Sequence, residues 1–192
     1  MRHNALMDDL AAFAEVARTR RTNLRVDPAR SVPVDLIEQL IRLAQWAPNH
    51  KRTWPWRFAV LQGTSRAELG EALSAFQAAR GDDEAKVAKA RTKFLRAPAL
   101  LAVASAAEPD PLRRAENRDA VAAGVQNVLL GAAAAGLAGY WGTGAVVEAP
   151  AVKELCGFGL DDDLVAMIYL GWPLDGGPIA PDRPEPQVRW LG

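Results

Sequence analysis

Three adjacent residues, Arg20-Arg21-Thr22, have the types and spacing that most clearly point to a binding site in this chain. Guanidinium groups are planar, and their N–H donors form a fork that matches the oxygens of a phosphate group. The Thr22 hydroxyl adds a further donor, and Arg25 follows soon after. Because the cluster lies where a helical segment ends, its cations could instead complement the negative end of that helix. The cluster therefore predicts a phosphate site, with helix capping as the alternative.

The segment from Trp46 to Phe58, WAPNHKRTWPWRF, is unusual for a loop. It contains three tryptophans, two prolines, three cationic side chains and one of the two histidines of the chain. Loops are normally small and polar, because they lie on the surface and must satisfy their backbone there. A large, aromatic and basic loop suits a surface that stacks on a flat anionic partner. We expect something to cover it.

A third segment, Tyr140 to Gly144, reads YWGTG. Its glycines would let backbone N–H groups come close to a flat ligand. Two glycines alone are a weak signal for a ligand site. This segment therefore supports a binding site only in combination with the two segments described above.

The composition excludes several classes of protein. The chain of 192 residues has a formal net charge of zero, which gives no general electrostatic attraction to nucleic acid. Its longest apolar run, Val128 to Ala138, is too short to span a bilayer. The first residues, MRHNALMDDLAAF, are acidic where a signal peptide needs an apolar core. We therefore expect a cytoplasmic protein that binds neither nucleic acid nor membrane.

The residue inventory also argues against the common metal and nucleophile sites. Two widely separated histidines and one cysteine give no zinc-ligand pattern, so we expect no metal. The chain has no GxSxG elbow and no phosphate loop that ends in Gly-Lys-Ser/Thr. Cys156 has apolar neighbours, which favours a small buried side chain over a nucleophile.

Hydrophobic periodicity and turn residues predict a single domain over residues 1–192, of class α+β. Helices are predicted over 5–20, 33–47, 65–79, 82–96, 113–137 and 150–156, and strands over 57–62, 99–105 and 164–170. The charges of helix 82–96, including Lys89 and Lys93, are interpreted as a solvated face rather than a binding site. Helix 113–137 is apolar on all sides from Ala120 onward, which predicts that it packs against neighbours all around.

The last stretch, GWPLDGGPIAPDRPEPQVRWLG, is rich in proline and glycine and cannot form a core element. It ends in Val188, Trp190 and Leu191, which are too apolar for a free end. We interpret it as an arm that docks elsewhere, such as on a second subunit.

The three segments, in this order and spacing, resemble the nitroreductase family of FMN-dependent oxidoreductases, especially its small bacterial members. The likeness covers nearly the whole chain and includes motifs that are each weak alone. They are Arg20-Arg21-Thr22, Ala47-Pro48-Asn49-His50, Trp54-Pro55-Trp56-Arg57-Phe58, Gln126-Asn127, Trp141-Gly142-Thr143 and Leu170-Gly171-Trp172-Pro173.

The resemblance implies a nitroreductase-like fold, with a central, mostly antiparallel sheet flanked by helices. It also implies a homodimer that exchanges its C-terminal arms and holds FMN at the subunit interface. NADH or NADPH would deliver a hydride to flavin N5, and a nitro, quinone or related small-molecule acceptor would remove it in a ping-pong mechanism. The chemistry is then the flavin's, so no catalytic side chain is assigned. The alternatives are a non-catalytic flavin- or nucleotide-binding protein, or flavin cleavage, dehalogenation or enone reduction on the same fold.

The resemblance also assigns roles to residues of the flavin site. Arg20, Arg21 and Thr22 would hold the phosphate and ribityl groups, and Arg25 would lie near the pyrimidine edge of the ring. A positive charge at that edge stabilises the reduced flavin. The remaining expected contacts are Trp46 and His50 on the partner's flavin, Trp141, Gly142 and Thr143 near N5, and Arg183 on the phosphate.

Two positions depart from the family pattern. Thr22 replaces the usual serine and keeps the hydroxyl group. Trp54 stands where glutamine is common, which adds apolar bulk near the cofactor. This bulk could narrow the substrate range or close the site to bulky acceptors.

Overall fold

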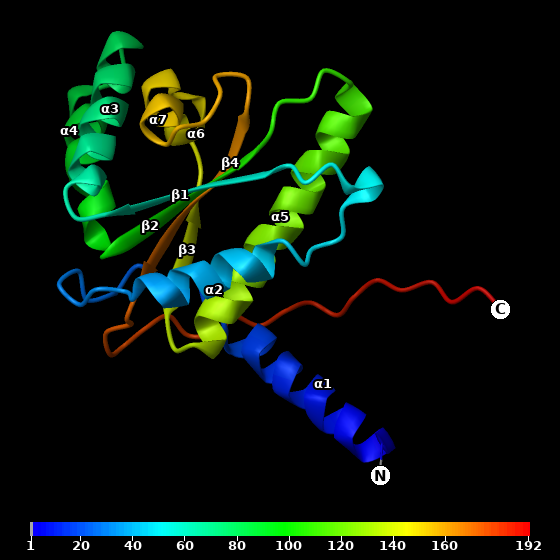
Figure 1. Cartoon of the computed structure of the whole chain (residues 1–192). Coiled ribbons are helices and arrows are strands. Elements are labelled where there is room, and N and C mark those ends of the chain that lie inside the picture. The colour runs from blue at the N-terminus through cyan, green and yellow to red at the C-terminus, as the bar shows by residue number, and fades with distance from the viewer. Residues whose placement is uncertain (1) are drawn as a thin grey trace.

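The computed structural model describes the backbone of residues 2–192 and the side chains from residue 7 onward. Within this part of the chain, the centre is an antiparallel sheet with the strand order β1-β2-β4-β3 (Figure 1). The strands are β1 (Trp56–Gln62), β2 (Ala99–Ser105), β3 (Ala138–Gly142) and β4 (Asp163–Gly171). The two inner strands, β2 and β4, are continuous apolar runs because both of their faces are buried. The expected α+β class is confirmed.

Helices cover both faces of the sheet. α2 (Val34–Ala44) and α5 (Pro111–Ala134) cover one face. The other face carries α3 (Ser65–Ala79), α4 (Glu84–Lys93), α6 (Ala145–Glu148) and α7 (Pro150–Leu155), with the short 3-10 turn η2 (Phe94–Arg96). A second 3-10 turn, η1 (His50–Arg52), contacts α5 instead. Successive strand residues point to opposite faces, so Leu101 packs towards α5 whereas Leu100 packs towards α3.

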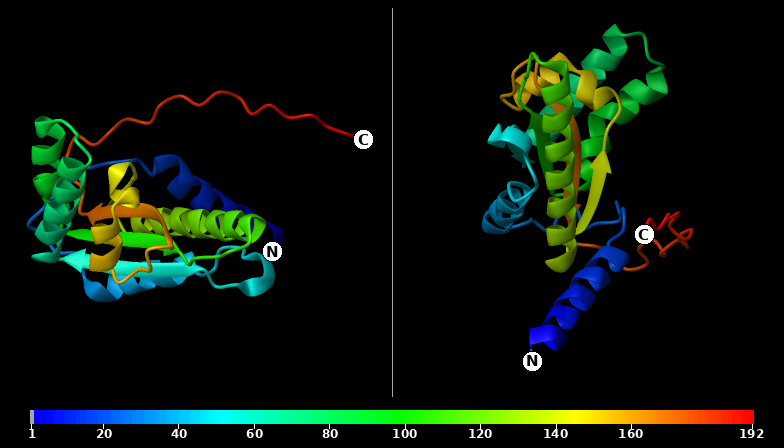
Figure 2. Two further views of the ribbon diagram at one scale, coloured as in Figure 1. Left: turned by 90° about the horizontal axis from the view of Figure 1, so that it is seen from above. Right: turned by 90° about the vertical axis from the view of Figure 1, so that its right-hand side faces the viewer.

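Two segments project from this body, namely α1 (Arg2–Thr19) and the arm, residues 174–192 (Figures 1 and 2). Leu10 and Phe13 of α1 are each 58% exposed, although their helical spacing is typical of a buried face. Trp190 near the end of the arm is 90% exposed. Within the described part of one chain, nothing covers these apolar side chains.

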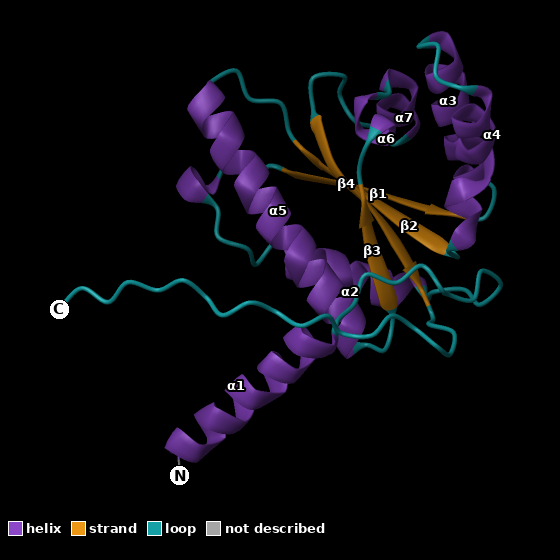
Figure 3. Cartoon of the chain, turned by 180° about the vertical axis from the view of Figure 1, so that it is seen from behind, coloured by secondary structure: helices purple, strands orange, loops and turns teal. Residues whose placement is uncertain are grey.

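The longest helix, α5, runs along the sheet beside α2 (Figure 3). Its start is fixed by Asp110, whose side chain accepts a hydrogen bond from the backbone N–H of Arg113 at 2.8 Å, and by Pro111 in the first turn. It ends before Gly136, which adopts a left-handed backbone with φ of 77°. None of the described helices has the length and low charge needed to cross a bilayer.

α5 approaches α2 closely at Gly124. A Cβ atom there would lie 2.7 Å from Nε1 of Trp56 and 2.8 Å from the carbonyl oxygen of Ala44, so any side chain would push the helices apart. Another flank of α5 is open, because Ala123 and Gln126 are exposed. The prediction that this helix packs against neighbours on all sides is therefore wrong for a single chain.

Candidate functional site

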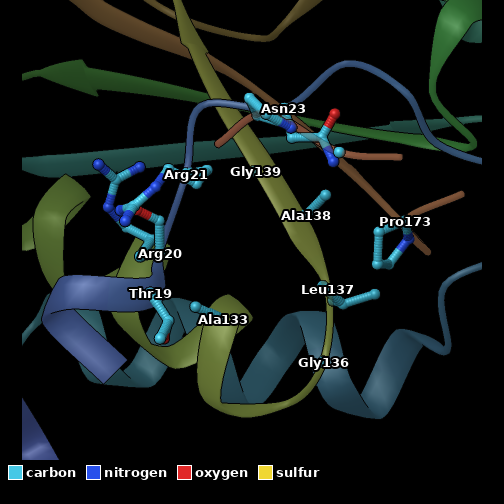
Figure 4. Close-up of a pocket in the computed structure, with 12 residues that line it drawn as sticks. Thr19, Arg20, Arg21, Asn23, Ala133, Gly136, Leu137, Ala138, Gly139 and Pro173 are labelled. Atoms are coloured by element: carbon cyan, nitrogen blue, oxygen red, sulfur yellow. The ribbon is translucent and has the colours of Figure 1, made fainter. Parts of the chain in front are cut away.

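A pocket of about 320 Å³ lies where the end of α1 meets the end of α5 and the start of β3 (Figure 4). Small side chains and backbone form most of its wall, and two guanidinium groups lie together on one side. We call it the arginine pocket. Its lining residues are Thr19, Arg20, Arg21, Asn23, Ala133, Gly136, Leu137, Ala138, Gly139, Pro173, Gly177 and Pro178.

The chain after α1 is held against the free edge of β3. Thr22 forms a parallel bridge with Gly139, and the backbone N–H of Asn23 donates to the Gly139 carbonyl oxygen at 3.3 Å. Gly139 has no room for a side chain on its buried face, because a Cβ atom would lie 2.9 Å from Cδ2 of Leu129. This pairing places Arg20 and Arg21 of the predicted phosphate cluster in the pocket wall, whereas Thr22 is exposed and does not line the pocket.

The charge of the arginine pocket comes from Arg20 and Arg21, whose side chains are half-buried. Arg21 Nη1 donates to the carbonyl oxygen of Arg20, the residue that follows α1, at 2.6 Å. None of the ion pairs between described residues involves either arginine. Two guanidinium groups without a carboxylate partner leave the pocket suited to an anion.

A second, smaller pocket of about 220 Å³ lies beside the far end of β3, on the side of α4. We call it the lysine pocket. Its wall combines cationic, aromatic and apolar side chains with the glycine of the YWGTG segment. The lining residues are Leu24, Lys89, Lys93, Arg96, Tyr140, Gly142, Thr143, Val146, Met167 and Tyr169.

The sequence interpretation missed the role of Lys93. This residue was assigned to a solvated face, but the structure places it half-buried in the wall of the lysine pocket. Burial lowers the pKa of its amino group, and the nearby positive charges of Lys89 and Arg96 lower the pKa further. The available signal was the spacing of these three cations, four and three residues apart, which places them on one side of a helix.

The structure does not bring all three residues of the Trp141-Gly142-Thr143 motif to the same place. The Trp141 indole packs against the core on the α5 face of the sheet, where its Nε1 donates to the carbonyl oxygen of Val165 at 3.1 Å. Gly142 and Thr143 line the lysine pocket instead. A Cβ atom on Gly142 would lie only 3.1 Å from Cε1 of Tyr140, so glycine keeps this wall open.

Arg25 and Arg183 line neither pocket. Arg25 anchors the start of the arm, because its Nη1 donates to the carbonyl oxygen of Gly176 at 2.6 Å and its own carbonyl oxygen accepts from the N–H of Leu174 at 2.9 Å. Arg183 is exposed on the extended arm. The structure of one chain therefore does not bring these two predicted contacts to the pockets.

His50 lies at the opposite end of α5 from the arginine pocket, and Trp46 does not line that pocket. Trp46 is 84% exposed, and His50 Nδ1 lies 2.8 Å from Oε2 of Glu116 in the N-terminal part of α5. The arginine pocket borders Ala133 of the same helix. Glu116 and Ala133 are separated by 17 positions along the helix (133 − 116), which corresponds to about 25 Å at 1.5 Å per residue. One chain cannot bring His50 and Arg20 to the same small group.

The loop after His50 has a fixed and strained backbone. Lys51, Arg52 and Trp54 all adopt positive φ, between 51° and 59°. Such a backbone costs a residue other than glycine about 1–2 kcal/mol. The Asn49 side chain accepts a hydrogen bond from the N–H of Trp54 at 2.9 Å, and Thr53 donates to the buried side chain of Asn117. These bonds hold the Trp54 side chain outward, 58% exposed.

Other chemistry finds little support in the described part of the chain. No cluster of three or more potential metal ligands occurs among the residues described. Burial raises the pKa of the Cys156 thiol to about 11, so the thiol is protonated near neutral pH and is a poor nucleophile.

Comparison with known proteins gives a consistent result. The nitroreductase family matches residues 17–172. The Escherichia coli (strain K12) protein named "Putative NAD(P)H nitroreductase YdjA" is 30% identical over 151 residues, which are 78% of this chain and 82% of that protein.

Two crystal structures extend this similarity to the fold. A nitroreductase-like family protein from Bacillus cereus has a TM-score of 0.75 at 30% identity, covering 90% of this chain and 91% of that one. A nitroreductase with bound FMN from Bacteroides fragilis has a TM-score of 0.74 at 18% identity, covering 93% and 97%, and at that identity the likeness concerns the fold alone. The predicted nitroreductase-like fold is confirmed, and this chain belongs to the nitroreductase family.

Proposed function

We propose that this protein is an FMN-dependent oxidoreductase that takes a hydride from NADH or NADPH and passes two electrons to nitro, quinone or related acceptors by a ping-pong mechanism. The observation that carries the proposal is the arginine pocket, which opens onto the glycine-containing edge of β3. Membership of the nitroreductase family supports it. So do the name of the Escherichia coli relative, which mentions NAD(P)H, and the FMN bound by the Bacteroides fragilis protein of the same fold.

The residues present fit FMN. Arg20 and Arg21 provide charged donors for its phosphate, and the Thr22 hydroxyl lies exposed next to them for the ribityl chain. Gly139, paired with Thr22, offers backbone without a side chain in the wall of the arginine pocket. Gly142 does the same at the lysine pocket, so the ring would lie near Gly142 and Thr143.

When bound, FMN supplies the hydride transfer at its N5 atom. The protein positions the ring and sets the charge around it. Lys93 is the deepest cation of the lysine pocket, and we assign it to the polar, carbonyl-bearing edge of the ring, where positive charge favours reduction. A contact from Arg25 to the same edge stays a prediction, and it requires that this guanidinium leave the carbonyl oxygen of Gly176.

We further propose a homodimer with a flavin at each subunit interface. The separation of His50 from the arginine pocket along α5 means that His50 serves a flavin there only if a second copy presents it, and we assign the exposed Trp46 to the same partner contact. Two copies packed antiparallel along the open flank of α5 would bring these opposite ends together. The exposed apolar side chains of α1 and of the arm's tip would then pack against the second copy. The exchanged arm would carry Arg183 towards the phosphate group of the partner's FMN.

The experiment is a turnover assay of the purified protein loaded with FMN. NADH and NADPH are each supplied with a nitroaromatic compound and with a neutral quinone. Oxidation of either nicotinamide that depends on the acceptor supports the proposal. If the protein binds FMN tightly but no pair of donor and acceptor is turned over, the oxidoreductase proposal is rejected. The protein would then be a flavin-binding protein without this activity.

A further inference from the structure

The lysine pocket carries more positive charge than one flavin edge requires. Lys89, Lys93 and Arg96 all line it, and none of its lining residues is acidic in the part of the chain that the structure describes. The other two cations of α4 form ion pairs with carboxylates outside the pocket. Lys86 Nζ lies 3.0 Å from Asp83, and Arg91 Nε lies 3.5 Å from Glu71. The three pocket cations have no such partner among the described ion pairs.

Like charges held together disfavour one another, and the lowered pKa of Lys93 reports this repulsion as well as burial. An anion placed between the cations would relieve it. Two phenols line the same pocket, with the Tyr140 and Tyr169 rings 5.3 Å apart. Burial raises the pKa of Tyr169 well above its usual range, so its hydroxyl stays protonated and able to donate to an oxyanion.

The three cations differ in how far they are exposed. Lys93 is half-buried, whereas Lys89 and Arg96 are exposed at the rim. We propose that Lys89 and Arg96 form an anion subsite that receives a carboxylate or phosphate group of the reacting substrate. This inference rests on the proposed function, because it makes the rim pair a determinant of which substrates reach the flavin. A pocket of about 220 Å³ suits a compact oxyanion on a small molecule rather than a whole dinucleotide.

The first test is binding to the FMN-loaded, oxidised protein with two probes of similar shape, benzoate and benzamide. Each exposed charge pair contributes up to about 1 kcal/mol, so we expect benzoate to bind about tenfold more tightly at low salt. The double variant Lys89→Gln/Arg96→Gln should lose this preference, and added salt should weaken it in the unmodified protein. The matched control is Lys86→Ala, which removes a cation of the same helix that does not line the pocket.

Turnover distinguishes the sources of the oxyanion. A lower kcat/KM for 4-nitrobenzoate but not for 4-nitrobenzamide in the double variant would assign the subsite to the acceptor. A selective loss with NADPH relative to NADH would assign it to the donor's phosphate. Equal binding of benzoate and benzamide by the unmodified protein would overturn the inference, as would a double variant that loses FMN affinity while keeping the anion preference. Turnover of a neutral quinone tests the proposed function separately, because no anion is involved.

Discussion

Removing a guanidinium from the arginine pocket should weaken FMN binding through the phosphate alone. Arg20 and Arg21 line the pocket and lack carboxylate partners among the described residues, so each is available for a charge-assisted hydrogen bond. Such a bond contributes about 1.5–3 kcal/mol. Arg20→Ala or Arg21→Ala should therefore raise the Kd for FMN by about 10- to 150-fold.

The assay is titration of the flavin-free protein with FMN and with riboflavin, which lacks the phosphate, followed by quenching of flavin fluorescence. The unmodified protein should prefer FMN, and each arginine variant should lose much of that preference while its affinity for riboflavin changes little. Arg18→Ala is the matched control, because Arg18 is an exposed cation of α1 that does not line the pocket. Unchanged FMN affinity in both variants, or an equal loss for both flavins, would refute the phosphate assignment.

Three further predictions concern stability and assembly. Gly124→Ala should lower the free energy of unfolding by about 1–3 kcal/mol, because the new Cβ atom would meet Trp56 and the backbone of α2. Thermal unfolding should then show a Tm lower by a few degrees. An unchanged Tm would show that the two helices can move apart without cost. Asp163 accepts two hydrogen bonds of 2.7 Å from Arg114, which lower the pKa of its carboxyl group. The pair therefore stabilises the fold at pH values above the unfolded-state pKa of about 3.9. This contribution is lost as the pH falls through the lower folded-state pKa. Asp163→Asn should therefore cost about 1 kcal/mol at neutral pH in denaturant unfolding, with a smaller difference in acid, and a difference that grows in acid would contradict this sign. Truncation after Gly176 should raise the monomer fraction in analytical ultracentrifugation, and a truncated protein that stays fully dimeric would count against an exchanged arm.

The sequence predicted elements well where a local pattern agrees with the tertiary structure. The strand predicted over 99–105 and the helix predicted over 65–79 match β2 and α3 to the residue. β2 is a continuous apolar run buried on both faces, and α3 is closed by Gly81 in a left-handed backbone. At the C-terminal end of α3, the residue that signals the end is the residue that forms it, whereas its N-terminus has no side-chain cap hydrogen bond.

Prediction failed where tertiary contacts override local composition. β3 was expected only as a glycine-rich segment, and it becomes a strand because β4 and the chain at Thr22 pair with it. Lys93 looks solvated in a polar helix, and only the tertiary structure shows that it lines a pocket together with residues of β3 and β4. No local signal predicts the pairing of His50 with Glu116, because 66 residues separate them.

The candidate site was predicted in part. Arg20 and Arg21 were expected at a phosphate site, and they line the arginine pocket. Gly142 and Thr143 were expected near the ring, and they line the pocket next along β3. Trp46, His50, Arg25 and Arg183 could not be placed from one sequence, since their proposed roles depend on a second copy or on movement of the arm.

The central claim is that this chain holds FMN that a nicotinamide can reduce. The most direct measurement is the visible absorption spectrum of the purified, FMN-loaded protein under anaerobic conditions, recorded before and after addition of NADH and then of NADPH. We expect the flavin band to bleach with at least one donor and to return when a nitroaromatic or quinone acceptor is added. A protein that retains no FMN, or whose flavin band is unchanged by both nicotinamides, would contradict the claim.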